Sequence, residues 1–497
     1  MWRNVSILLL AALVIALPFL FRQASEQADW QPGDPELIII TPHNEAIRYE
    51  FALGFSRWHQ ATYGKPVKVD WRAIGGTTEI SRYLTAEFVT AARGWWTGQG
   101  LTWPSGAGDV LVDRKFDPRN APTNPAEVAG WESLRDLYTR FRATDDHHAF
   151  TARIDLFFGG GDYDHTKAFG EGLTVAPWPT NALPAGLFIA EDGTELIPAS
   201  IGGETWRTAT FFGNAVSTFG ICYNLDRLRD LGITNAPRQW SDLADARYFR
   251  QVGLADPTKS GSFAKAFELI IHQQCYDAVR ADGFSDDDIS RHESAIRAAK
   301  LPAGEMPDGV PAAYQAAVEE GWLNGIRLVQ RIGANARYFT DSASKVPIDV
   351  SSGNAAAGLA IDFYGRFQAQ SSAGPDGREH MAFVTPEGGS GSSCDPISLL
   401  RGAPHRETAV RFMEFLLSDD GQKLWTYRPG TSGGPEKFAL RRIPIRRTFY
   451  PSENPTLQAA HEEHLRHAAD NLADPRINPY AIAQTFTYRS RWTGQHF

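Results

Sequence analysis

Short apolar runs alternate along the chain with amphipathic stretches, and this pattern predicts an α/β protein. Leu37–Thr41 is the kind of β-branched run expected of a strand buried on both faces. Asn44 can cap the helix that follows it, and Gly64 can end that helix. Val67–Trp71 predicts a second strand, and Glu79–Phe88 begins another helix. The β-α-β-α order predicts a mostly parallel sheet with right-handed crossovers.

The regular pattern is interrupted twice, and we interpret both interruptions as insertions. Residues 92–150 are rich in Gly, Trp and Pro and contain an amphipathic piece at Trp131–Phe141. Residues 281–312 are charged and Pro-rich, which is typical of a solvated segment. Strands are predicted between them at Ile154–Phe158 and Val252–Ala255.

Four predicted strands end in small polar residues directly before a helix. In open α/β sheets ligands bind beyond the carboxyl ends of the strands, where the first N–H groups of the next helix lack partners. One such loop alone is ordinary turn chemistry, but four together favour a binding cleft for a small polar or anionic solute. The candidate ligand-binding residues in these loops are His43, Asn44, Gly76, Thr77, Thr78, Gly160, Gly161, Ser260 and Ser262.

The amino terminus and the charge limit the partners. Residues 5–21 run 17 positions without a charge, which is about 25 Å as a helix and at the short end of what spans a bilayer. No cleavage motif follows, so we expect a signal anchor and linker over residues 1–35. The net charge of −9 argues against a nucleic-acid partner.

Several motifs for other chemistry are weak. Ser262 and Lys265 fit the S-x-x-K pattern of serine acyl-transferring enzymes, but no S-D-N follows. Three histidines at positions 461, 464 and 467 lack the zincin spacing and predict a solvated helical face. The arginine pairs at 441–442 and 446–447 predict a solvated rim. Cys222 and Cys275 are the first choice for a disulfide, and three buried free thiols are the alternative.

Five segments in order resemble the bacterial extracellular solute-binding proteins of ABC transporters, in the type 2 periplasmic binding proteins and their ferric-iron-binding-like branch. They are IDLFFGGGDYDHTKAFGEGL (154–173), FGICYNLDRLRDLGI (219–233), QWSDLADARYFRQVGLADPTKSGS (239–262), GNAAAGLAIDFYGRF (353–367) and FVTPEGGSGSSCDPISLLRGAPHRETAVRFMEFLLSDDGQKLW (383–425). The resemblance implies a two-lobed fold with a hinge and an interlobe ligand cleft, preceded here by one N-terminal hydrophobic helix. It implies lobe 1 at 36–212 plus 384–432 and lobe 2 at 213–383 plus 433–497, with hinge crossings near 211–217 and 380–386.

The resemblance also implies ligands and partners. In the ferric binders a His near the first strand and a pair of tyrosines bind the metal, and His43 and Tyr364 match two of these positions. Phe363 replaces one phenolate, which weakens the case for Fe³⁺ because this ion needs anionic oxygen ligands. Asp362 and Tyr364 therefore join the candidate ligand-binding residues, with a phosphonate or sugar phosphate as an equally good cargo.

The implied function is that of the substrate-binding component of an ABC importer, a receptor and not an enzyme. It would have no cofactor, apart from ferric ion as a transported ligand. We expect a monomer with a permease and an ATPase as partners, located in the periplasm or otherwise outside the cytoplasm and anchored to the membrane by residues 5–21. The alternatives are a membrane-anchored solute sensor and, with less support, a serine acyl-transferring enzyme on the same scaffold.

Overall fold

The computed structural model describes residues 30–143, 150–179, 182–302 and 305–494. The predicted anchor at residues 5–21 lies outside these ranges. Among the helices inside them, none combines the length and the apolar character that crossing a membrane requires.

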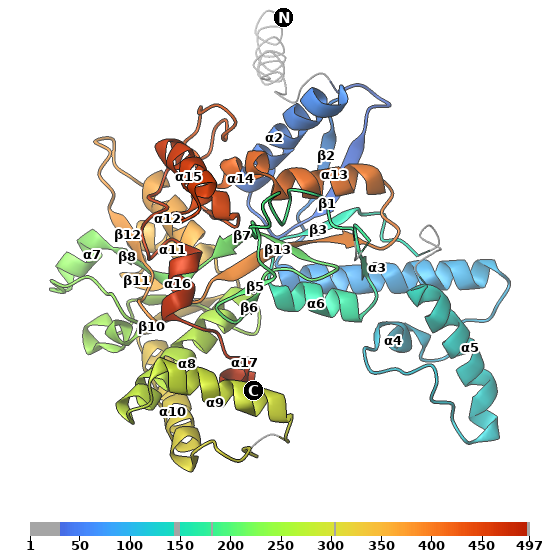
Figure 1. Cartoon of the computed structure of the whole chain (residues 1–497), viewed down its shortest axis with the longest axis horizontal. Coiled ribbons are helices and arrows are strands. Elements are labelled where there is room, and N and C mark those ends of the chain that lie inside the picture. Colours follow the sequence, from blue (N-terminus) through green and yellow to red (C-terminus); the bar gives the residue numbers. More distant parts are fainter. Residues whose placement is uncertain (1–29, 144–149, 180–181, 303–304, 495–497) are drawn as a thin grey trace, which may run out of the picture.

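The described residues form two large sheets, which define two lobes (Figure 1). The sheet of lobe 1 has seven strands in the order β14-β7-β13-β3-β1-β2, with β4 also paired to β13. Its strands β1, β2 and β3 are parallel, and β13 is antiparallel to β3 and β7. The strands of lobe 1 are β1 Glu36–Ile40, β2 Lys68–Arg72, β3 Leu156–Phe158, β4 Thr174–Val175, β7 Phe212–Ser217, β13 Ser393–Leu400 and β14 Ile443–Pro444.

Lobe 2 is built on a five-stranded sheet in the order β10-β9-β11-β8-β12. Strands β9, β10 and β11 are parallel, and β8 runs antiparallel to both of its neighbours. The strands are β8 Phe219–Asn224, β9 Val252–Ala255, β10 Ala336–Thr340, β11 Ala357–Ile361 and β12 Met381–Val384. A separate hairpin consists of β5 Ser200–Ile201 and β6 Glu204–Thr205.

Helices cover both faces of the lobe 1 sheet, and the alternation of side chains along β1 shows why. Leu37 and Ile39 belong to a core shared with one set of helices, whereas Ile40 belongs to a core on the opposite face. The first set is α2 Glu45–Tyr63, α13 Arg406–Leu417 and α14 Asp419–Thr426. The second set is α3 Thr77–Gly98, α4 Ala107–Val112, α5 Pro125–Arg142 and α6 Asp162–Gly170.

The helices of lobe 2 pack around one further core. Helices α8 and α10 approach closely, because a Cβ at Gly321 would lie 2.4 Å from the Cα of Cys275. The helices of lobe 2 are α7 Leu225–Asp230, α8 Gly261–Ala281, α9 Asp286–Ala299, α10 Ala312–Ala334, α11 Lys345–Ser351 and α12 Asp362–Ser371. Short 3₁₀ helices lie at η1 Trp240–Ala244, η2 Ala246–Tyr248 and η3 Arg447–Phe449.

Two chain crossings join the lobes. The first passes from β7 to β8 through Thr218, and the second passes from β12 to β13 through residues 385–392. Sheet membership differs from the expected lobe boundaries in three places. Residues 213–217 and β14 were assigned to lobe 2 but belong to the lobe 1 sheet, and Val384 was assigned to lobe 1 but belongs to β12 of lobe 2. The chain then runs through α15 Pro455–His467, α16 Pro479–Thr485 and α17 Ser490–Gly494. Helix α17 packs against α8 and α10 of lobe 2.

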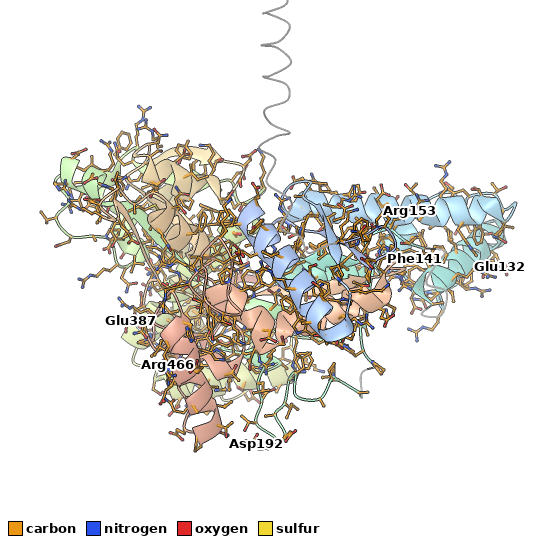
Figure 2. All side chains as sticks on the ribbon, turned by 90° about the horizontal axis from the view of Figure 1, so that it is seen from above. Glu132, Phe141, Arg153, Asp192, Glu387 and Arg466 are labelled. Carbon is orange, nitrogen blue, oxygen red and sulfur yellow. The ribbon has the colours of Figure 1, made fainter. Side chains whose placement is uncertain are left out.

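Both regions interpreted as insertions contain helices. The outer part of α3 forms, with α4 and α5, a group that extends away from lobe 2 (Figure 1). Figure 2 places Glu132 at the outer end of this group, on the opposite side of the molecule from Glu387. The second region contains α9. Ser285 caps the start of this helix by accepting a hydrogen bond from the amide of Asp288 at 3.2 Å. This helix is not wholly solvated, because Ile289, His292 and Glu293 are buried.

Candidate functional site

Three of the predicted loops of lobe 1 meet at the glycines that follow β3. Gly159 and Gly160 have φ values of +97° and +110°, which L side chains rarely adopt. A Cβ at Gly159 would lie 2.7 Å from Cε1 of His43, and one at Gly160 would lie 2.6 Å from Cγ2 of Thr77. The glycines therefore let the ends of β1, β2 and β3 close on one another, as the sequence predicts.

His43 is buried, and both of its ring nitrogens have partners. Nδ1 lies 2.9 Å from Oγ1 of Thr41, and Nε2 lies 2.8 Å from Oδ2 of Asp395. The arrangement fits an imidazole whose Nε2–H donates to the carboxylate while Nδ1 accepts from the threonine hydroxyl. Neither nitrogen then has a free lone pair for a metal ion. Asn44 caps α2 by accepting a hydrogen bond from the amide of Ile47 at 3.1 Å.

Asp395 and Arg442 form an ion pair beside His43 that sequence reasoning missed. Their side chains are 5% and 2% exposed, and Arg442 also donates to Oγ of Ser217 at 2.7 Å. Burial would by itself raise the pKa of Asp395, but the Arg442 guanidinium and His43 hold it well below its usual range. The other carboxylate oxygen accepts from the amide of Gly160 at 3.0 Å. This pair fixes the glycine loop to the base of the cleft.

One signal in the sequence points to this pair. Asp395 is the one charged residue of the buried strand β13, and a buried charge of this kind needs a partner. The partner is 47 residues away. Because Arg442 and Arg446 are buried, the interpretation of both arginine pairs as a solvated rim is wrong. The apolar Ile443–Pro444 strand beside Arg442 carries this arginine into the core.

The start of α6 carries two partly exposed carboxylates, Asp162 and Asp164. Asp164 accepts a hydrogen bond from the amide of Gly161 at 3.3 Å and one from the side chain of Thr77. Burial raises the pKa of Asp164. Asp162, Gly160 and Gly161 are partly exposed, and Gly76 at the start of α3 is exposed. Thr77 and Thr78 are partly exposed beside it.

The start of α8 in lobe 2 has a different character. Ser260 is its N-cap residue but makes no side-chain capping bond, and the first turn contains no acidic residue. Ser260 is only 8% exposed, and within the described part of the chain its hydroxyl makes no hydrogen bond. The partly exposed Ser262 hydroxyl likewise has no partner there. These two hydroxyls and the first amides of α8 can donate to a ligand.

The remaining predicted residues, Asp362 and Tyr364, lie at the start of α12. Asp362 is fully buried, is paired with Arg366, and accepts from the amide of Thr218 at 3.2 Å. Burial raises the pKa of Asp362 and raises that of Tyr364 to about 12. The Arg442 guanidinium of lobe 1 lies 4.1 Å from the ring centroid of Phe363. Asp362 therefore serves the hinge in this arrangement, whereas the partly exposed Tyr364 can face a solute.

A buried ion pair joins the two lobes. Nζ of Lys265 in α8 lies 3.0 Å from Oε1 of Glu204 in the β5–β6 hairpin, and 3.3 Å from the ring centroid of Tyr488. The hairpin belongs with lobe 1 because Trp206, which directly follows it, lies in the lobe 1 core. Burial alone would lower the pKa of Lys265, but Glu204 raises it above its ordinary value. A lysine held in its charged form is a poor base for Ser262, so the geometry does not support the acyl-transferring alternative.

Other candidates for chemistry do not form a site. Within the described ranges, no group of three or more His, Cys, Asp or Glu residues is placed to hold a metal ion. The expected solvated histidine face is wrong for His461 and His464, which are buried; His461 lies 2.8 Å from the carbonyl oxygen of Phe449. Cys222 and Cys275 are free thiols and not a disulfide, since each Sγ lies against a different backbone carbonyl.

Three comparisons place this chain among known proteins. Residues 203–449 match the sequence model of the family described as bacterial extracellular solute-binding protein. An uncharacterized protein of Haemophilus influenzae is 25% identical over 272 residues, which is 55% of this chain and 60% of that protein. The chain therefore matches well under two thirds of the length of that curated relative.

Solved structures with a similar course of the chain include three binding proteins. They are the periplasmic binding protein AfuA of Actinobacillus pleuropneumoniae with fructose-6-phosphate bound (14% identity, 93% of this chain and 97% of that one, TM-score 0.48), the ferric binding protein of Campylobacter jejuni (13%, 93% and 99%, 0.41) and the spermidine/putrescine-binding protein PotD of Streptococcus pneumoniae (13%, 93% and 96%, 0.44). Two α/β lobes with two crossings agree with the family match. Residues 203–449, about half of the chain, are thus similar to the bacterial extracellular solute-binding proteins.

Proposed function

We propose that this protein captures a small phosphorylated or carboxylated solute that also carries hydroxyl groups, and delivers it to the permease of an ABC importer. The observation that carries the proposal is the start of α8. There, two serine hydroxyls and a helix N-terminus without a side-chain cap lie in lobe 2 with nothing in the described chain to satisfy them.

The start of α8 suits an anion. The first amides of a helix and the positive end of its dipole favour negative charge. The loop before the helix carries Lys259, whose side chain is 61% exposed and whose Nζ lies 3.9 Å from Oδ2 of Asp256 in the same loop. Helices α3 and α6 differ, because each has an acidic residue in its first turn, Glu79 in α3 and Asp162 and Asp164 in α6. These carboxylates make the α8 end the better place for a phosphate or carboxylate.

The lobe 1 side suits hydroxyl groups. Asp162 and Asp164 offer acceptor oxygens, and Thr77 and Thr78 offer hydroxyls that donate or accept. A polyol phosphate has the complementary set, with hydroxyl donors at one end and an anion at the other. The two lobes would thus hold opposite ends of one solute, and closing the hinge would enclose it.

The lobes already approach each other between these two surfaces. Lys265 lies one turn along α8 from Ser262 and pairs with Glu204, and the charge of Asp162 acts on Glu204. The start of α6 and the start of α8 therefore both lie near this contact. A solute between them would touch both lobes, which is how a receptor of this architecture couples binding to closure.

A ferric ion as the cargo is a second proposal with less support. Tyr364 can supply one phenolate, but its pKa is raised to about 12, which disfavours the anionic form that Fe³⁺ needs. His43 would have to release Asp395 or Thr41 to bind a metal. A phosphorylated solute requires neither change.

A thermal-shift panel tests the proposal. Hexose phosphates, phosphonates, ferric citrate and polyamines are offered to the wild type and to Ser260→Ala, Ser262→Ala and the matched control Ser342→Ala, which lies in an exposed turn. Binding stabilises the folded protein by mass action, about 2.7 kcal/mol at a hundredfold excess over Kd. We expect one phosphorylated solute to stabilise the wild type and the control, and to lose most of that effect in the α8 variants. Stabilisation that the α8 substitutions leave unchanged would contradict the proposal.

A sensor that binds the same solute and feeds no permease is distinguished by transport. Uptake of the radiolabelled solute by cells that lack this protein should fall to background and return on complementation. Normal uptake in the deletion strain would favour the anchored sensor.

A further inference from the structure

The chain connects the lobes a third time, through residues 475–494, which we call the C-terminal strap. On the lobe 1 side, Oη of Tyr480 donates to the carbonyl of Ile445 at 2.8 Å. Nearby, the amide of Tyr488 donates to the carbonyl of Gly202 in the β5–β6 hairpin at 2.7 Å. A Cβ at Gly203 would lie 2.0 Å from the carbonyl oxygen of Tyr488, so the strap lies directly on the hairpin turn.

On the lobe 2 side the end of the strap is buried. Trp492 is 1% exposed, and its Nε1 donates to Oε1 of Glu293 in α9 at 2.8 Å. Arg491 pairs with the same carboxylate through two bonds, one of them 3.0 Å long from its Nε. The amide of Arg489 donates to Nε2 of His272 in α8 at 3.0 Å. The strap is therefore held by both lobes.

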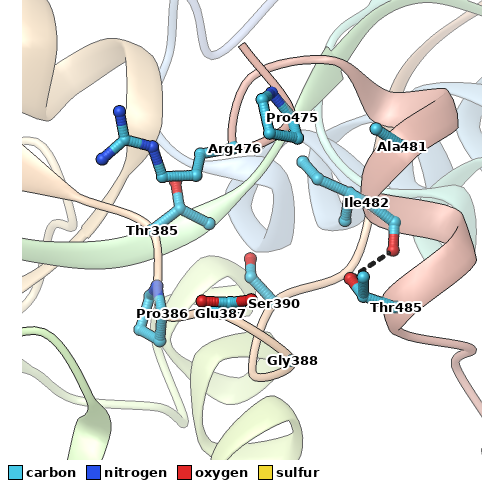
Figure 3. Close-up of a pocket in the computed structure, with 10 residues that line it drawn as sticks. All are labelled: Thr385, Pro386, Glu387, Gly388, Ser390, Pro475, Arg476, Ala481, Ile482 and Thr485. Carbon is cyan, nitrogen blue, oxygen red and sulfur yellow. Dashed lines mark hydrogen bonds between the residues drawn. The ribbon is translucent and has the colours of Figure 1, made fainter.

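A pocket of about 210 Å³ lies between the strap and the second crossing (Figure 3). None of the predicted ligand-binding residues lines it. One wall comes from the crossing and the other from the strap, and the lining residues are Thr385, Pro386, Glu387, Gly388, Ser390, Pro475, Arg476, Ala481, Ile482 and Thr485. Because its walls belong to separate segments of the hinge region, the shape of the pocket depends on how the lobes are arranged.

The surface that lines the pocket is mostly apolar, but one serine hydroxyl can still donate a hydrogen bond. Oγ of Ser390 accepts from the amide of Phe219 at 2.9 Å, and Ser390 is 2% exposed. Its O–H has no acceptor in the described part of the chain, and Figure 3 shows the hydroxyl pointing into the space below Ile482. The hydroxyl of Thr485 is different, because it donates to the carbonyl of Ile482 at 3.0 Å. A ligand with a hydrogen-bond acceptor could accept a hydrogen bond from the Ser390 hydroxyl.

The charges at the rim do not favour an ion. Arg476 makes two hydrogen bonds to Asp474, at 3.0 and 2.7 Å, and it also feels the charge of Glu387 across the pocket. These opposite charges compensate one another, so neither a free anion nor a free cation has an unmatched partner here. The volume of the pocket suits a ring-sized molecule. An apolar cavity of about 150 Å³ binds benzene in another protein, and this pocket is somewhat larger.

We propose that the pocket is a second small-molecule site, behind the solute cleft, which takes a neutral ring-sized molecule carrying a hydrogen-bond acceptor. Occupancy stabilises the present arrangement of the lobes, because the ligand fits between the crossing and the strap as they lie here and binds less well once they move apart. By linkage, the pocket ligand and the transported solute then influence each other's affinity. The observations that support this site do not depend on which solute the cleft binds.

Binding is tested with phenol and toluene as probes, by ligand-observed NMR on the full chain. Phenol should bind the wild type roughly threefold to tenfold more tightly than toluene, the ratio expected of one hydrogen bond, and Ser390→Ala should remove this preference. Ala481→Leu fills the pocket and should weaken phenol binding at least tenfold. Gln484→Leu adds the same side chain to an exposed position of the same helix, so it should bind phenol as the wild type does. Equal binding by the two leucine variants would overturn the proposal. If Ala481→Leu does not fold, the proposal is tested by Ser390→Ala alone. Loss of the preference for phenol over toluene supports the proposal, and an unchanged preference overturns it.

The effect on the hinge is tested with two spin labels. The native cysteines are all buried, so labels are placed at Lys65→Cys in lobe 1 and Arg291→Cys in lobe 2, two exposed positions. Phenol should narrow the distribution of distances between the labels, and the addition of Ala481→Leu should abolish this narrowing. Bound phenol with an unchanged distribution would refute the proposed coupling to the lobes.

Discussion

Nζ of Lys265 lies 3.0 Å from Oε1 of Glu204, and this ion pair joins α8 of lobe 2 to the β5–β6 hairpin of lobe 1. The two side chains are 16% and 3% exposed. Removing one partner leaves an unpaired buried charge, so we expect Lys265→Met to destabilise the protein by roughly 3–5 kcal/mol. Urea denaturation at pH 7 measures this loss.

The double variant provides the control for that prediction. Lys265→Met combined with Glu204→Leu removes both charges and should recover most of the lost stability, because an apolar pair of similar size replaces a buried ion pair at little cost. If the double variant is as unstable as the two single variants added together, the pair does not act as a unit.

Arg442 should matter more for stability than an exposed arginine that also has a carboxylate partner. Arg442→Met deprives the buried Asp395 of its main counter-charge, and we expect a loss of about 3 kcal/mol or more in the free energy of unfolding. Arg57 pairs with Glu436 at the surface, where the side chains are 52% and 45% exposed. Arg57→Met should therefore cost at most about 1 kcal/mol. Equal losses would show that the Asp395 network is not important to the folded state.

Three buried histidines predict sensitivity to acid. Burial lowers the pKa of His165, His272 and His464 to about 4, below the value of 6.5 that applies to an unfolded histidine. The unfolded chain therefore binds more protons between these values, and the stabilising contribution is complete above pH 6.5 and is lost as the pH falls toward 4. Each histidine should account for roughly 2 kcal/mol of lost stability by pH 5.

Denaturation curves at pH 7 and pH 5 measure this loss of stability. His165→Gln should be less stable than the wild type at pH 7 but should lose less on acidification, since the side chain that takes up the proton is gone. Phe157 stacks on His165 at 4.1 Å between ring centroids, so Phe157→Leu removes packing without removing a titrating group. That variant should be destabilised equally at both pH values. If His165→Gln loses as much stability between pH 7 and pH 5 as the wild type does, protonation of His165 is not a source of the acid sensitivity.

The predicted anchor at residues 5–21 is tested by fractionation. The full chain should remain with membranes after an alkaline carbonate wash, whereas a variant that lacks residues 1–29 should be recovered in the aqueous phase. Recovery of the full chain in the wash would show that these residues do not hold the protein in the bilayer.

Local patterns predicted several elements of both lobes well. The expected strand at 252–255 has these bounds in the structure, and the helix that begins after Asn44 ends at Gly64, whose φ is +78°. These features depend on neighbouring residues: a cap, a left-handed glycine, and an apolar run. Glu79–Phe88 was expected to begin a helix, and the helix runs from Thr77 to Gly98, where Ala92 and Trp96 continue its apolar face.

The parts that sequence reasoning missed depend on contacts between distant residues. Arg442 was interpreted as solvated because its neighbours in sequence are basic, yet its partner Asp395 is 47 residues away. Lys265 and Glu204 are 61 residues apart, and only the folded chain shows that the serine beside Lys265 has no free base. The C-terminal strap was expected in lobe 2, but it gives no strong periodic signal, so its additional attachment to lobe 1 was not foreseen.

Isothermal titration with a hexose phosphate and with the corresponding unphosphorylated hexose tests the central claim most directly. The hexose phosphate to use is the one that gives the largest thermal shift in the panel. We predict that the phosphate form binds with a single site per chain, that the free sugar binds at least a hundredfold more weakly, and that Ser260→Ala combined with Ser262→Ala removes most of this difference. Equal affinity for the two sugars, or a phosphate preference that survives in the double serine variant, would contradict the account.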